Sequence, residues 1–201
     1  MTTLVGILLS GRGSNFLALH GAMERGDVPA RIALVVSNVA EAQGLEKARA
    51  LRLPTVCIPH RQEPGRVAHE ARLLEALRHA EVEWVCLAGY MRVLSESFIA
   101  QYPHRILNIH PALLPDFPGL DAAKRQWGAG VKVAGATAHL VDEGVDTGPT
   151  LLQGSLIVRG DEGPEGLERR ILEEVEHVIY PRAVRLFIDR LRRETDEGKE
   201  Q

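Results

Sequence analysis

The chain has 201 residues, of which 45% are hydrophobic and 25% are charged, and its formal net charge is -3. These values are typical of one soluble domain with a buried core, and they exclude a disordered, collagen-like or membrane-spanning chain. The chain has 24 basic and 27 acidic residues. This balance argues against a nucleic-acid partner, because nucleic-acid-binding domains usually carry a strong excess of basic residues. The two cysteines, Cys57 and Cys86, lie in separate apolar runs and predict buried thiols. With no secretory or membrane-spanning pattern, we expect a cytoplasmic protein with no membrane partner.

Short apolar runs alternate with helix-forming segments through the first half of the chain. Runs of this length that are rich in Val, Ile and Leu are typical of strands buried in a parallel sheet. The predicted strands cover residues 4–9, 32–36, 55–58, 82–87 and 105–109, and the predicted helices cover residues 14–25, 42–51, 64–79 and 95–102. This alternation predicts right-handed crossovers, and therefore a three-layer, doubly wound α/β fold with a mostly parallel sheet.

The pattern changes after the fifth predicted strand. Residues 110–120 contain three prolines, which favours an irregular loop, and a helix is expected over 122–128. Two strand-like segments, 132–141 and 150–158, are joined so closely that they predict an antiparallel pair. A long helix is expected over 164–193, bent near Pro181. We expect one domain over residues 1–193, followed by a disordered tail over 194–201.

The first candidate site is the segment Ser-Gly-Arg-Gly-Ser-Asn at 10–15. It lies where a strand ends and a helix begins, a place where free N–H groups favour an anion. Phe16 replaces the third glycine of a dinucleotide fingerprint, and the Gly-Lys-Ser/Thr of a Walker loop is absent. A monophosphate cradle therefore competes with a purely structural turn in which Ser14 or Asn15 caps the helix.

The second candidate is Asn108-Ile109-His110 at the carboxyl end of the fifth predicted strand. Ligands of open α/β sheets bind beyond the carboxyl ends of the strands, and strand alternation places Asn108 and His110 on one side. An amide and an imidazole could bind an oxyanion and move a proton. The alternative is that both residues only anchor the following loop.

Asp146 lies in an acidic, glycine-containing turn, which is usually a solvated connection. It could instead orient His110 as a general base, or form a metal site with His110 and His139. No compact ligand motif supports the metal site, so we expect none. The histidines at 20, 60, 69, 79 and 104 are interpreted as surface or helix residues.

Four motifs together resemble one family. They are Ser-Gly-Arg-Gly-Ser-Asn at 10–15, Leu-Ala-Gly-Tyr-Met-Arg-Val-Leu at 87–94, Leu-Asn-Ile-His-Pro-Ala-Leu-Leu-Pro at 107–115 and Asp-Thr-Gly-Pro at 146–149. In this order they resemble the phosphoribosylglycinamide formyltransferases, which belong to the folate-dependent formyltransferases. The resemblance implies transfer of a formyl group from 10-formyltetrahydrofolate to the amine of glycinamide ribonucleotide, in purine biosynthesis. It implies a direct attack through a tetrahedral intermediate and small-molecule substrates, and it leaves open a monomer or a homodimer.

The same resemblance implies roles for individual residues. Asn108, His110 and Asp146 resemble the catalytic residues, with Asp146 raising the pKa of His110. The residues expected at the nucleotide phosphate and ribose are Gly13, Ser14, Asn15 and Glu176, and those expected at the folate are Arg66, Met91, Arg92, Val93, Leu94, Asn108, Val141 and Asp146.

The chain departs from the family pattern at three positions near the site, which are Ala112, Asp121 and Glu173. Two other interpretations remain open at this stage. One is another 10-formyltetrahydrofolate-using enzyme of the same fold, such as a methionyl-tRNA formyltransferase or a deformylase, although we expect no room for their additional domains. The other is a non-catalytic module that binds a nucleotide phosphate, in which Asn108, His110 and Asp146 need not converge.

Overall fold

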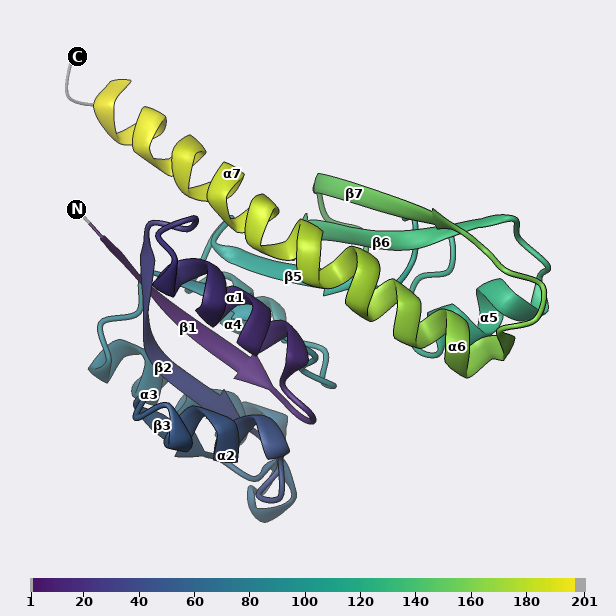
Figure 1. Ribbon diagram of the computed structural model, residues 1–201. Helices are drawn as coiled ribbons and strands as arrows, with labels where there is room; N and C mark the ends of the chain where they lie inside the picture. The colour runs from purple at the N-terminus through teal and green to yellow at the C-terminus, as the bar shows by residue number, and fades with distance from the viewer. Residues whose placement is uncertain (1, 198–201) are drawn as a thin grey trace.

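The computed structural model describes residues 2–197, and in this part of the chain one seven-stranded sheet forms the centre of the molecule (Figure 1). The strands are β1 (Thr3–Leu9), β2 (Ala30–Ser37), β3 (Thr55–Cys57), β4 (Trp84–Leu87), β5 (Ile106–His110), β6 (Val133–Leu140) and β7 (Thr150–Ile157). Their order across the sheet is β3-β2-β1-β4-β5-β6-β7. The first five are parallel, whereas β6 is antiparallel to both β5 and β7. The predicted fold class is confirmed.

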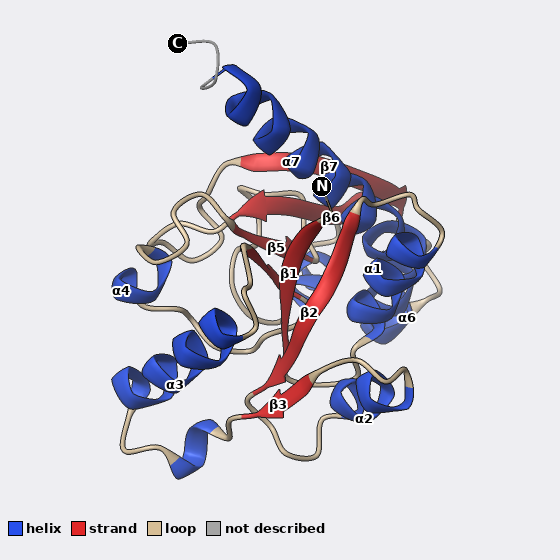
Figure 2. Ribbon diagram, turned by 90° about the vertical axis from the view of Figure 1, so that its left-hand side faces the viewer, coloured by secondary structure: helices blue, strands red, loops and turns tan. Residues whose placement is uncertain are grey.

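Helices cover both faces of this sheet, as Figure 2 shows. They are α1 (Ser14–Glu24), α2 (Gln43–Ala50), α3 (Arg66–His79), α4 (Glu96–Ile99), α5 (Ala122–Gly128), α6 (Gly163–Arg170) and α7 (His177–Glu197), with a 3-10 turn η1 (His60–Gln62) and a π-helical turn η2 (Ile171–Glu176). One buried cluster joins the sheet to α1, α2 and α7, and a second joins it to α3 and α4. The sheet therefore lies between two layers of helices, one packed against each face through its own buried cluster.

The sheet order places a switch point at its centre. The chain winds outward from β1 through β2 to β3, and then returns to pair β4 with the other side of β1. Strands β1 and β4 are buried because helices cover both faces, which explains their continuous apolar sequence. Open α/β sheets bind ligands at the carboxyl edge beside such a switch point. The loops that follow β1, β4 and β5 therefore mark the place to search for a site.

The C-terminal helix differs from the expectation. Helical structure is continuous from Gly163 to Glu197, and its irregular part is the π turn at Ile171–Glu176, one turn before Pro181. Residues 194–197 of the expected tail are thus helical, and residues 198–201 lie outside the described part. Gly154 of β7 lets this turn approach the sheet, because a Cβ there would lie 2.8 Å from Val175. None of the described helices is long and apolar enough to cross a membrane.

Candidate active site

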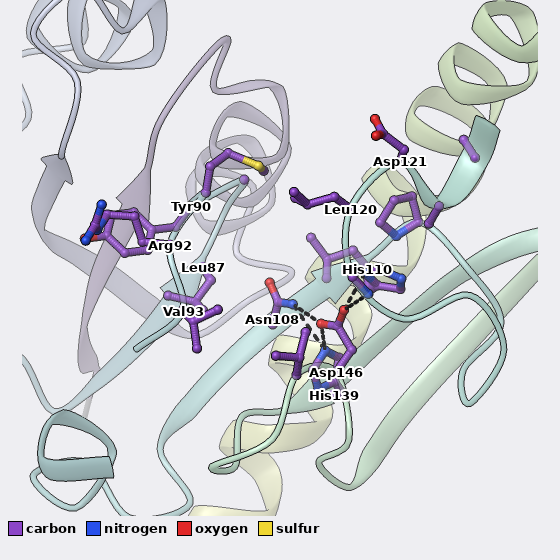
Figure 3. A pocket seen from close by; sticks show the side chains of 18 of the residues that line it. Leu87, Tyr90, Arg92, Val93, Asn108, His110, Leu120, Asp121, His139 and Asp146 are labelled. Atoms are coloured by element: carbon purple, nitrogen blue, oxygen red, sulfur yellow. Dashed lines mark hydrogen bonds and ion pairs between the residues drawn. The ribbon is translucent and has the colours of Figure 1, made fainter. Parts of the chain in front are cut away.

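A cavity of about 510 Å³ opens at the carboxyl edge of the sheet (Figure 3). Its walls come from the segment after β4, the end of β5, the loop leading to α5, and the loop between β6 and β7. Large apolar side chains remain exposed around it, including Met91 at 65%, Val93 at 54% and Leu120 at 77%. Exposed apolar surface gathered in one concave place is typical of a ligand site.

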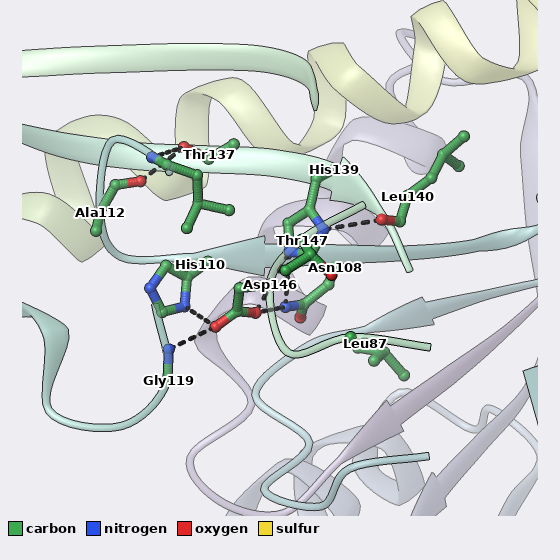
Figure 4. A network of polar contacts seen from close by, with 12 residues as sticks. Leu87, Asn108, His110, Ala112, Gly119, Thr137, His139, Leu140, Asp146 and Thr147 are labelled. Atoms are coloured by element: carbon green, nitrogen blue, oxygen red, sulfur yellow. Dashed lines mark hydrogen bonds and ion pairs between the residues drawn. The ribbon is translucent and has the colours of Figure 1, made fainter. Parts of the chain in front are cut away.

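Asp146 is the centre of a polar cluster in this cavity (Figure 4). Its Oδ2 lies 3.1 Å from Nδ1 of His110 and accepts a hydrogen bond from the backbone N–H of Gly119 at 2.8 Å. Its Oδ1 lies 3.4 Å from Nδ2 of Asn108 and 3.5 Å from Nε2 of His139. The structure thus brings together Asn108, His110 and Asp146, which the sequence places on two separate segments. Convergence of this kind is not expected of a plain solvated turn.

The backbone and the environment of Asp146 both indicate a specialised position. Its φ is 57°, a left-handed conformation that costs a residue with a side chain about 1–2 kcal/mol, and such conformations gather at functional sites. Burial alone would raise the pKa of this carboxyl. Hydrogen bonds from His139 and from Gly119, together with the nearby His110, instead lower the pKa below its ordinary value. Asp146 is therefore ionised at neutral pH.

His110 has acceptors at both ring nitrogens. Nδ1 faces Asp146, and Nε2 lies 2.9 Å from the carbonyl oxygen of Phe117. Burial lowers the pKa of His110, although the Phe117 carbonyl and Asp146 both act to raise it. Asp146 thus acts in the expected direction, but the net pKa of His110 lies below its ordinary value, because the loss of solvent outweighs the neighbouring charge. An imidazolium formed here gives up its proton readily.

His139 also belongs to this cluster, although the sequence suggested it only as a possible metal ligand. It is buried on β6 directly opposite Asn108 on β5. Its Nδ1 lies 2.9 Å from the Leu140 carbonyl oxygen, and its Nε2 lies 3.2 Å from Nδ2 of Asn108. Nε2 of His139 thus lies against both the Asn108 amide nitrogen and the Asp146 carboxylate. The alternating pattern of 132–141 predicted that His139 lies on a strand. Only the structure shows the strand register that places His139 opposite Asn108.

The Asp146 carboxylate lies between the two rings, with one oxygen toward His110 and the other toward His139. Within residues 2–197, no group of three His, Cys, Asp or Glu side chains could hold a metal ion.

The predicted phosphate loop connects β1 to α1, and its Ser10 hydroxyl accepts a hydrogen bond of 2.8 Å from the N–H of Met91 in the cavity wall. Gly13, Ser14, Asn15 and Glu176 do not themselves line the cavity. Gly13 has φ 73°, and a Cβ on it would lie 2.5 Å from the Cα of Gly44, so the turn requires glycine. No side chain caps the start of α1. Asn15 instead donates a hydrogen bond of 2.5 Å to Glu176, which excludes the interpretation of Asn15 as a helix cap.

Glu176 ends the π turn and is only 6% exposed. Burial raises its pKa to about 7, which the Asn15 amide only partly offsets. The Asn15 amide oxygen is itself buried without a partner among the described residues. Buried polar atoms without a partner are rare, and they indicate strain, a functional role or a bound water or ion. π turns are often found at functional sites, and this one places a carboxyl next to the phosphate loop.

Most of the residues expected at the folate line the cavity. Met91, Arg92, Val93 and Leu94 form the wall after β4, and Val141 lies on the wall formed by the loop after β6. Arg66 is not among the lining residues. Its guanidinium lies 3.7 Å from Glu70 on α3, and its contact with the folate stays a prediction.

The three departures from the family pattern differ in position. The Ala112 carbonyl accepts a hydrogen bond of 2.6 Å from Thr137, so this backbone is anchored without a side-chain contribution at 112. Asp121 precedes α5 with φ 54° and lines the cavity. Glu173 is exposed on the π turn and does not line the cavity.

The fold and the site define an α/β protein with an acid–base cluster in a cavity at the carboxyl edge of a doubly wound sheet. Residues 4–184 match the formyl transferase family, and the chain belongs to this family. The matched range includes Asn108, His110, His139 and Asp146.

Individual relatives agree with this assignment. The chain is 39% identical to a phosphoribosylglycinamide formyltransferase from Bacillus subtilis, over 90% of this chain and 93% of the relative. It is 41% identical to a trifunctional purine biosynthetic protein from Drosophila pseudoobscura, over 98% of this chain, but it spans only 14% of that protein. A crystal structure of glycinamide ribonucleotide transformylase 1 from Symbiobacterium toebii is 45% identical, with a TM-score of 0.91, and covers 94% of this chain and 88% of that chain.

Proposed function

We propose that this protein transfers the formyl group of 10-formyltetrahydrofolate to the primary amine of glycinamide ribonucleotide, which gives formylglycinamide ribonucleotide and tetrahydrofolate in purine biosynthesis. The observation that carries the proposal is the convergence of Asn108, His110 and Asp146 in a cavity beside the Gly13 loop. A module that only binds a phosphate would not need this convergence.

The residues divide between the two substrates. The backbone at Gly13 and Ser14 and the side chain of Asn15 bind the 5′-phosphate region, and Glu176 accepts hydrogen bonds from ribose hydroxyls. Folding has already removed most of the solvent from its carboxyl, so binding hydroxyl donors there requires little further desolvation. The folate occupies the cavity between the wall of Met91, Arg92, Val93 and Leu94 and the loop that carries Val141 and Asp146. Arg66 has no part in this proposal.

The reaction begins when the amine nitrogen attacks the formyl carbon. The formyl C=O becomes an oxyanion, which the Asn108 amide stabilises by a hydrogen bond. A protonated His110 adds a second, charge-assisted hydrogen bond when its Nε2–H turns from the Phe117 carbonyl oxygen to the oxyanion. The Asn108 contact with Asp146 is long at 3.4 Å, so this N–H is the one free to turn toward the oxyanion. The attacking nitrogen then loses a proton, the bond between the formyl carbon and the folate N10 breaks, and N10 receives a proton.

Asp146 and His110 move protons in this scheme. The ionised Asp146 orients the His110 ring and stabilises its cation, while the low pKa of His110 makes that cation a ready proton donor. His139 positions the Asn108 amide, whose nitrogen lies 3.2 Å from its Nε2. The scheme forms no covalent bond to the protein and uses no metal.

The proposal is tested by following the change in folate absorbance when purified protein and 10-formyltetrahydrofolate are mixed with and without glycinamide ribonucleotide. We expect turnover only when the nucleotide is present. Conversion at the same rate without the nucleotide would indicate a folate hydrolase of the same fold, and no conversion in either mixture would refute formyl transfer.

A further inference from the structure

A buried hydrogen bond lies in the cavity wall apart from the Asp146 cluster. Tyr90 lines the cavity and is 8% exposed, and its hydroxyl oxygen lies 2.9 Å from Nε2 of His69 on α3. His69 is one of the histidines interpreted as surface or helix residues; it is on the helix and is only 2% exposed. Figure 3 shows Tyr90 and Arg92 together on the wall after β4.

The surroundings of His69 determine which of its nitrogens carries the proton. Nδ1 is buried and has no hydrogen-bond partner in the described part of the chain. Burial and the charge of Arg92 lower the pKa of His69, so the ring is neutral at pH 7 and carries one N–H. A proton on Nδ1 would be enclosed without an acceptor, which is rare for a buried N–H, whereas a proton on Nε2 leaves the unpaired hydrogen on Tyr90, a residue that borders the cavity. The N–H is therefore on Nε2, and it donates to the Tyr90 oxygen.

This tautomer leaves the hydroxyl proton of Tyr90 free. Within residues 2–197, the hydroxyl has no hydrogen-bond partner except His69. Burial also raises the pKa of Tyr90, so the hydroxyl keeps its proton. The nearby carboxylate of Glu70 accepts hydrogen bonds from the backbone N–H and the hydroxyl of Ser95 and is thus already engaged.

The charge of Arg92 is close enough to act on both Tyr90 and His69. Arg92 lines the same cavity and forms no hydrogen bond or ion pair with a residue that the structure describes. A hydroxyl donor beside a guanidinium suits an oxygen acceptor of a ligand, above all a carbonyl or carboxylate oxygen.

We propose that Tyr90 donates its hydroxyl proton to a carbonyl or carboxylate oxygen of the bound formyl donor, and that His69 is a positioning residue that directs this proton by binding the Tyr90 oxygen. The inference rests on the proposed function, because that function places the folate in this cavity.

The kinetic test compares Tyr90→Phe with the wild type, varying each substrate in turn. Removing one hydrogen bond should raise the KM for 10-formyltetrahydrofolate about two- to tenfold, with kcat and the KM for the nucleotide within about twofold of wild type. Tyr102→Phe is the matched control, since Tyr102 is also buried but does not line this cavity. An unchanged folate KM in Tyr90→Phe would overturn the inference.

The role of His69 is tested with two substitutions and a spectrum. His69→Leu should raise the folate KM as Tyr90→Phe does, the double variant should be no worse than either single variant, and His69→Gln, whose amide can donate in place of Nε2, should restore most of the affinity. In the wild type, ¹⁵N NMR of His69 should show the proton on Nε2. A proton on Nδ1, or equal loss of affinity in the Gln and Leu variants, would refute the positioning role.

Failure of this inference can be separated from failure of the proposed function. Calorimetric titration of wild type and Tyr90→Phe with tetrahydrofolate measures affinity without turnover. If the wild type transfers no formyl group but binds tetrahydrofolate more tightly than Tyr90→Phe does, the donor role holds and only the reaction is wrong. If the wild type does not bind tetrahydrofolate, both proposals fail.

Discussion

At the scale of single residues, the site is organised by contacts that converge on one carboxylate. Asp146 receives a backbone N–H from Gly119 and lies against His110 and His139, so its position is fixed by three separate segments. The Gly119 N–H and the two imidazole rings all face the negatively charged oxygens of this carboxylate. Replacing that charge should therefore disturb chemistry more than folding.

Asp146→Asn should lower kcat by roughly 100-fold or more, in the range of general acid–base catalysis, while thermal unfolding stays near that of wild type. The amide cannot stabilise a His110 cation by charge. Glu143→Gln is the matched control, because it removes one charge from an exposed position in the same loop. Wild-type rates in the Asp146 variant would show that Asp146 is only a turn residue.

Glu176 predicts a pH dependence of stability. Its pKa is raised from 4.5 to about 7 in the folded state, so the folded protein holds this proton where the unfolded chain releases it. The contribution is fully present below pH 4.5 and is lost as the pH rises through 7. The free energy of unfolding of the wild type should therefore fall between pH 5 and pH 8, as measured with denaturant. In Glu176→Gln this fall should be smaller by roughly 3 kcal/mol.

The control for this experiment is Glu173→Gln, which changes an exposed carboxyl on the same π turn. We expect this variant to keep the wild-type slope of stability against pH. A Glu176→Gln variant with the wild-type slope would contradict the buried, raised-pKa carboxyl.

At the scale of elements, the turn from β1 to α1 depends on one glycine. Gly13 combines a positive φ with close contact to the backbone of Gly44 on α2. Gly13→Ala should reduce the free energy of unfolding by at least roughly 1–2 kcal/mol, because α2 must also move. Gly11→Ala, in the same loop, should change it much less, since a Cβ there meets nothing within 4 Å. Equal stability of the two variants would contradict this packing.

Sequence patterns predicted the elements better than the contacts between them. The alternation of apolar runs and helix formers predicted the strands, because a strand that is buried on both faces has a short, continuous apolar sequence. Pro181 predicted a bend, but the irregular turn lies one turn earlier, at Ile171–Glu176. A π turn has no residue signature of this kind, and its position here depends on packing against Gly154.

At the scale of the whole molecule, the site exists because the sheet order brings distant segments to one edge. Motifs at 10–15, 87–94, 107–115 and 146–149 were recognisable one by one, and the order of strands gathers them around β1 and β4. The role of His139, the direction of the His110 pKa shift and the position of Arg66 could not be predicted. Each depends on register, burial or side-chain pairing, which sequence spacing does not determine.

The central claim is that the formyl group passes directly from the folate to the amine of the nucleotide. The most direct measurement supplies 10-formyltetrahydrofolate with an isotopically labelled formyl carbon and analyses the products by mass spectrometry. We predict that the label is found on glycinamide ribonucleotide, in an amount equal to the tetrahydrofolate formed. Label recovered as free formate, with the nucleotide unchanged, would contradict the account.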